Sequence, residues 1–142
     1  MPEPQTFMGL EPVPSAMAED GPRLDPIDDG IRLFNERYFF EAHEVLEDAW
    51  RREHGEPKVF LQGLIQLCAA YHHTQNNNFV GAVTLLERGA EKIRRYPPGY
   101  LGIDTVSLLA HVDADRAQLL RAQGGPSEPL SAFPRIERKV ES

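Results

Sequence analysis

The chain has 142 residues, which is enough for one compact domain with a single hydrophobic core. Its 22 acidic and 15 basic residues give a formal net charge of −7, so neither nucleic acid nor an anionic membrane surface is expected as a partner. Cys68 is the only cysteine, which excludes an intrachain disulfide framework and a cysteine-rich zinc site. No apolar run reaches membrane-spanning length, and the N-terminus lacks the layout of a signal peptide. A cytoplasmic protein is therefore expected.

Both ends of the chain differ in composition from its middle. Residues 1–24 hold five prolines and scattered acidic residues without hydrophobic periodicity, and we expect a flexible arm. Residues 124–142 open with Gly-Gly-Pro and end in mixed charges, and we expect a flexible tail there. In one alternative, Phe133 and Ile136 dock this tail back onto the core. The folded helical domain is expected to span residues 25–123.

Within that domain the spacing of apolar residues is helical throughout, and no stretch alternates as a strand would. Pro26 and Pro57 suit the first turn of a helix, and Asp104 suits an N-cap. The fold class that follows is all-α, a compact bundle of about five helices. The helices are expected at about residues 26–35, 38–53, 57–76, 79–95 and 105–122.

A repeat at an offset of 40 residues relates the second predicted helix to the fourth. Phe39–Ala42 resembles Phe79–Ala82, and Pro57 corresponds to Pro97. Each copy is similar to the helical hairpin of tetratricopeptide repeats, in which small residues let the paired helices approach closely. Two copies fall short of the three or more that such arrays need. The bundle is therefore expected to consist of two hairpins plus a closing C-terminal helix.

The most informative stretch is His-Glu-Val-Leu-Glu-Asp-Ala-Trp, from His43 to Trp50. A helix advances about 100° per residue, so His43 and Glu47 lie on one side, at the boundary of the apolar face, with Trp50 one turn further on. The repeat has Val83 and Ala90 at the positions of His43 and Trp50. Packing a hairpin of this kind therefore does not require a histidine and a tryptophan there.

The third predicted helix carries a second polar group of residues. Gln62, Gln66 and His73 align on the face opposite its apolar stripe, and His72 lies on a flank that is expected to be more buried. Gly63 in mid-helix costs about 1 kcal/mol relative to alanine, which a close helix crossing would justify. If this helix packs on the second, its polar residues approach the His-to-Trp stretch. The candidate pocket residues are His43, Glu47, Trp50, Gln62 and His72, followed by Glu44, Gln66 and His73.

Several stretches together resemble the domain of unknown function 309 family. They are Phe34-Asn35, Tyr38–Trp50, Phe60–Gln66, Ala69–His72 and Gly102–Asp104. The hallmark of that family, His-x-x-x-Glu-x-x-Trp, maps onto His43, Glu47 and Trp50. The resemblance covers about residues 30–110. It implies a small all-helical domain of prokaryotic type, and it implies no particular reaction.

His43 and Glu47 suit a metal-ligand pair or a proton-transfer dyad, and equally a hydrogen bond that only tethers one helix face. Glu47 stands where the zinc-peptidase motif His-Glu-x-x-His has its second histidine. Phe40 stands where the Glu-x-x-His of di-iron bundles has its glutamate. Neither metal motif is present. His111, Asp113 and Asp115 fit a solvated helix face.

Two classes of function remain, and whether the chain is an enzyme stays open. We favour a module that binds a small ligand or a protein segment in the His/Glu/Trp pocket, with no cofactor required. The alternative is a small hydrolase that holds a divalent metal ion at His43 and Glu47. A third ligand such as His72 near this pair would support the enzyme, whereas an arginine partner for Glu47 would support a structural pair. A homo-oligomer is compatible with either class.

Overall fold

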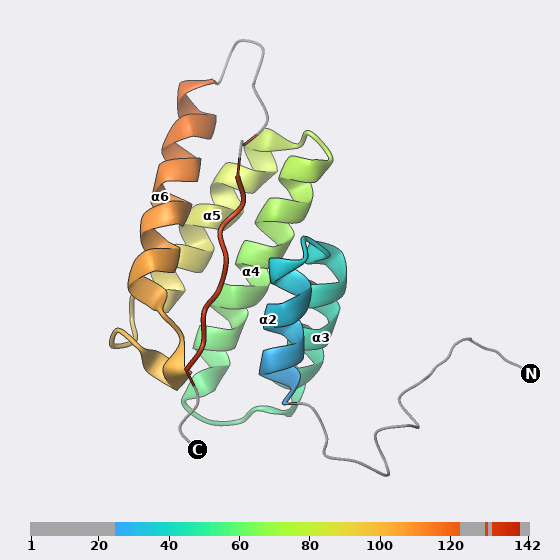
Figure 1. Cartoon of the computed structure of the whole chain (residues 1–142), viewed down its shortest axis with the longest axis vertical. Helices are drawn as coiled ribbons and strands as arrows, with labels where there is room; N and C mark the ends of the chain where they lie inside the picture. The colour runs from blue at the N-terminus through green and yellow to red at the C-terminus, as the bar shows by residue number, and fades with distance from the viewer. Residues whose placement is uncertain (1–24, 123–129, 131, 140–142) are drawn as a thin grey trace, which may run out of the picture.

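The computed structural model describes residues 25–122, 130 and 132–139, and its helices stand side by side in one array (Figure 1). The expected all-α bundle of five helices is confirmed, with each helix ending within two residues of the predicted position. The expected arm at residues 1–24 lies outside the described residues. The elements are α2 (Pro26–Asn35), α3 (Phe39–Arg52), α4 (Pro57–Gln75), α5 (Phe79–Ile93), the 3-10 turn η2 (Tyr100–Gly102) and α6 (Thr105–Arg121).

Aspartate side chains cap the N-termini of α2 and α6. The Asp25 carboxylate accepts a hydrogen bond from the Ile27 N–H at 2.9 Å, directly before Pro26 in the first turn of α2. The Asp104 carboxylate accepts from the Ser107 N–H at 3.1 Å at the start of α6. These side chains satisfy N–H groups that a helix start leaves without a partner in the helix. The sequence signals for both starts therefore correspond to contacts in the folded chain.

The central helix of the array is α4, which packs between α3 and α5. It is buried along most of its length, and its apolar stripe includes Phe60, Leu64 and Tyr71. A Cβ added at Gly63 would lie 3.0 Å from the Gly89 carbonyl oxygen, and one added at Gly89 would lie 2.9 Å from the Gly63 carbonyl oxygen. The two backbones thus approach closely. The close crossing that Gly63 suggested is between α4 and α5.

An extended segment, residues 132–139, crosses the side of the array between α2 and α6 and runs antiparallel to α6 (Figure 1). We call it the C-terminal segment. Ile136 is 2 % exposed, and the half-buried Phe133 ring lies 5.2 Å from the Phe39 ring. The arrangement differs from the expected flexible tail and matches the alternative in which Phe133 and Ile136 dock. Residues 132–139 therefore pack on the helical array. We call their seat the α2–α6 groove; Asn35 of α2, Phe39, Tyr71 and the turn before α6 form it.

Among the described residues, no helix is both long enough and apolar enough to cross a membrane.

Candidate functional site

The packing of α3 on α4 brings the candidate residues of both helices to one face. Near one end, the Phe40 and His72 rings lie 5.5 Å apart. Near the other end, the Lys58 ammonium lies 4.1 Å from the centre of the Trp50 ring. The two helices are therefore antiparallel, and their polar residues between these contacts follow opposite orders along the pair. We call this face the α3–α4 strip; it comprises Phe40, His43, Glu47 and Trp50 of α3 and Lys58, Gln62, Gln66 and His72 of α4.

Three polar atoms of the strip are buried without a hydrogen-bond partner among the described residues. They are Nδ1 of His43, Nε1 of Trp50 and Oε1 of Gln66. Most buried polar atoms in folded proteins are hydrogen-bonded, and leaving one unpaired costs about 1–3 kcal/mol. The strip therefore offers an unused indole donor, an unused amide acceptor and an unused imidazole nitrogen. An unpaired Trp50 N–H also departs from what a tryptophan used only for packing would show.

The partner of Glu47 in the structure is an arginine. Its carboxylate accepts a hydrogen bond from the Arg51 guanidinium at 3.3 Å, one turn further along α3. The His43–Glu47 hydrogen bond considered from the sequence does not occur among the bonds of the described residues. Glu47 is thus one half of a surface ion pair with an arginine, the partner that favours a structural role for it, whereas the buried Nδ1 of His43 has no partner among the described residues.

Lys58 belongs to the strip, and the sequence analysis missed it. Its ammonium donates to the Trp50 carbonyl oxygen at 2.7 Å and to the Glu53 carbonyl oxygen at 3.0 Å. It thereby satisfies carbonyl groups at the C-terminus of α3 while it lies over the Trp50 ring. The signal was its position: a lysine directly after the turn that ends a helix is well placed to reach the last carbonyls of that helix.

The two histidines of α4 have different surroundings. His72 packs against Phe40, whose ring also stacks on His43 at 6.3 Å, so His72 joins the strip through an aromatic contact. A ring nitrogen of His72 lies 3.2 Å from the Asn76 amide nitrogen. His73 is 3.2 Å from the Asn78 amide nitrogen and belongs to the turn between α4 and α5. Phe40, half-exposed between the two imidazoles, was also missed as a site residue.

The remaining candidates form no side-chain hydrogen bond or ion pair among the described residues. Gln62 is half-buried on α4, one turn before Gln66, and Glu44 is exposed on α3. In the described ranges, no three His, Cys, Asp or Glu side chains gather closely enough to hold a metal ion. The candidate groups instead follow the helices: His43 and Trp50 are separated by seven residues, or about 10 Å along the helix axis. The strip is therefore elongated along the two helices.

A second polar group lies inside the bundle. The Tyr71 hydroxyl donates to the Asp115 carboxylate at 2.7 Å, and His111 Nε2 lies 3.5 Å from the same oxygen. Burial raises the pKa of Asp115, while the Tyr71 hydrogen bond and the charge of His111 act in the opposite direction. Asp115 is only 5 % exposed, so the interpretation of this stretch as a solvated face was wrong for Asp115. The α6 helix turns this side chain inward, where it accepts the hydrogen bond from Tyr71 of α4.

A comparison with curated proteins found no match to the sequence. Residues 27–85 match the family model described as Domain of unknown function (DUF309). The matched range covers most of α2, all of α3 and α4, and the beginning of α5, so the whole strip lies within it. The resemblance inferred from the His-x-x-x-Glu-x-x-Trp stretch agrees with this match. Residues 27–85 of the chain are therefore similar to the domain of unknown function family DUF309.

Proposed function

We propose that this protein is a binding module whose α3–α4 strip holds a segment of a protein partner. The observation that carries the proposal is the set of three buried, unpaired polar atoms on His43, Trp50 and Gln66. Unpaired buried groups lower stability, so their presence on adjacent helices supports a partner whose binding moves the covering side chains aside and completes their hydrogen bonds.

The dimensions of the strip favour a polypeptide segment over a compact ligand. The unpaired atoms are spread over about 10 Å of helix length, which matches groups along a helix or an extended chain. At one end of the strip, Tyr38 and Phe40 are 54 % and 49 % exposed. They line a surface hollow of about 460 Å³ together with Arg37, Glu41 and His72, among other residues. Exposed aromatic side chains beside a hollow are typical anchors for a partner side chain.

The charges around the strip indicate the character of the partner. Arg51 and Arg52 are paired with Glu47 and Asp48, at 3.3 Å and 2.9 Å. Glu41 and Glu44, by contrast, are exposed and form no ion pair within the described part of the chain. The aromatic end of the strip therefore carries two acidic side chains, Glu41 and Glu44, beside one basic side chain, Arg37. A segment that combines basic residues with an apolar anchor complements this surface.

Peptide selection tests this proposal directly. Random peptides displayed on phage are selected on the full chain, and the enriched peptides are titrated while the fluorescence of Trp50, the only tryptophan, is recorded. We expect enriched peptides to carry basic residues beside an aromatic or aliphatic anchor, and to bind Phe40→Ser and His43→Ala at least about tenfold more weakly. Val106→Ser is the matched control, because Val106 is equally apolar and exposed but lies on α6. Equal binding by wild type and both strip variants, or no enrichment at all, would contradict the proposal.

A further inference from the structure

The C-terminal segment is held in the α2–α6 groove as a bound peptide is held, through its main chain. The Asn35 amide nitrogen donates to the Ile136 carbonyl oxygen at 3.0 Å, and the Ile136 N–H donates to the Asn35 amide oxygen at 2.8 Å. One side chain thus completes both main-chain bonds of a single residue. This contact involves only main-chain atoms of the segment, so any preference of the groove for a particular sequence comes from the flanking residues.

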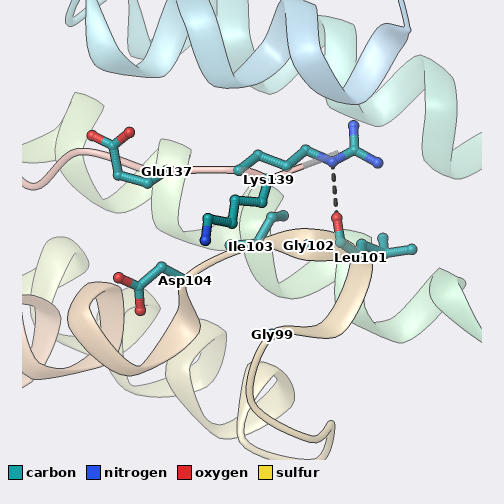
Figure 2. Close-up of a pocket in the computed structure, with 8 residues that line it drawn as sticks. Gly99, Leu101, Gly102, Ile103, Asp104, Glu137 and Lys139 are labelled. Atoms are coloured by element: carbon teal, nitrogen blue, oxygen red, sulfur yellow. Dashed lines mark hydrogen bonds between the residues drawn. The ribbon is translucent and has the colours of Figure 1, made fainter. Parts of the chain in front are cut away.

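The turn before α6 adds backbone pairing of the β type. The Asp104 N–H donates to the Glu137 carbonyl oxygen at 2.9 Å, and the Lys139 N–H donates to the Gly102 carbonyl oxygen at 2.7 Å. Figure 2 shows the C-terminal segment passing alongside this turn. Gly102 has a φ of 79°, and a Cβ there would overlap the Lys139 carbonyl oxygen, so only glycine permits this approach. The turn is shaped to accept an extended chain.

The side chains of Arg138 and Phe133 make the contacts that depend on the amino-acid sequence of the segment. The Arg138 guanidinium donates to Asp25 and Asp28 at 2.8 Å and 2.9 Å, and its Nε donates to the Leu101 carbonyl oxygen at 2.8 Å. Its side chain is 13 % exposed, so this ion pair is much drier than the other arginine pairs of the surface.

Phe133 is the apolar anchor. Its ring contacts Phe39 and Tyr71 at 5.2 Å and 5.7 Å, and the Arg37 guanidinium lies 5.2 Å above it. The groove therefore contacts three positions of the segment: the aromatic ring of Phe133, the backbone of Ile136 and the guanidinium of Arg138.

We propose that the α2–α6 groove is a peptide-binding site that the same segment of a second copy of this chain fills in trans, with the chain's own segment as its intramolecular occupant. We choose a second copy as the partner because its residues 132–139 carry the same side chains and backbone groups that make these contacts within one chain. A tethered segment reaches its groove at an effective concentration in the millimolar range. The closed monomer therefore dominates in dilute solution, and exchange between copies requires that the intramolecular contact be lost.

Two complementary full-length variants test the exchange. The segment variant Phe133→Ser/Arg138→Ala keeps the groove, and the groove variant Asn35→Ala/Asp28→Ala keeps the segment. We expect each variant alone to be monomeric at about 0.1 mM by native mass spectrometry, and their equimolar mixture to form a one-to-one heterodimer. Two folded variants that stay monomeric when mixed would overturn the proposal.

A fluorescent peptide of residues 130–139 gives an independent readout by anisotropy. We expect it to bind the segment variant at least about tenfold more tightly than it binds wild type, whose groove is filled, or the groove variant. The same peptide with Arg138→Ala should bind at least about tenfold more weakly. If the segment variant fails to fold, the single change Arg138→Ala replaces it. Binding that is no tighter to the folded variant than to wild type would refute the groove as a peptide site.

Discussion

Replacing Gln66 by methionine is expected to raise the free energy of unfolding. Methionine keeps the length and flexibility of the side chain and removes the polar atoms. Oε1 of Gln66 is buried without a partner among the described residues, and such an atom costs about 1–3 kcal/mol. Gln66 as a whole is half-buried, so we expect the free energy of unfolding to rise by an amount at the lower end of this range, about 1 kcal/mol. For a domain of this size that corresponds to a rise of roughly 4–8 °C in Tm.

Urea unfolding followed by circular dichroism measures the effect, with linear extrapolation and a check that the m-value is unchanged. Gln62→Met is the matched control, because Gln62 is a half-buried glutamine on the same helix without a buried, unpaired atom. We expect the control to shift stability by less than about 0.5 kcal/mol. A loss of stability in Gln66→Met, with an unchanged control, would mean that the Gln66 amide is paired in the folded protein. The strip would then be a structural contact between two helices, and the reasoning would be refuted.

Three further predictions concern the core and the C-terminal segment. Tyr71→Phe removes the donor to the buried Asp115 carboxylate and should lower the free energy of unfolding by about 1.5–3 kcal/mol in urea titrations. Because burial raises the folded-state pKa of Asp115, the contribution of this group to stability is present below its unfolded-state pKa and is lost as pH rises through its folded-state pKa. Urea unfolding at several pH values should therefore show wild type losing stability relative to Asp115→Asn over that pH window. Parallel stability profiles of the two proteins would contradict this. Gly102→Ala should cost about 1–2 kcal/mol from its left-handed backbone, and it should speed amide hydrogen exchange in residues 132–139 while leaving α3 unchanged.

The helices followed from the sequence because their signals are local. Pro57 and Asp104 act within one helical turn of their own positions, and the apolar spacing needs no knowledge of distant residues. The burial of Asp115 did not follow, because it depends on Tyr71, which lies 44 positions earlier in the chain. The docking of Ile136 depends on Asn35, 101 positions away, and no local pattern encodes such a pair.

The candidate site was predicted in part. His43, Trp50 and Gln66 were singled out from helix geometry, and each has a buried polar atom without a partner among the described residues, as does Arg116 of α6. The partner that Glu47 pairs with was not predicted from the sequence. Glu47 has a histidine four residues before it and an arginine four residues after it, and helix geometry allows either pair. The arginine is permanently charged, and a glutamate that precedes its basic partner has the more favourable orientation on a helix, so Glu47 pairs with Arg51.

The central claim, that the α3–α4 strip is a binding face, is tested most directly by a nuclear magnetic resonance titration. The ¹⁵N-labelled full chain is titrated with a peptide from the selection, and the indole N–H of Trp50 reports on one of the unpaired atoms. We predict that this signal and the backbone amides of α3 and α4 around His43 and Gln66 shift together, with one dissociation constant. Shifts confined to α6 or to residues 132–139, with the Trp50 indole signal unmoved, would contradict the claim.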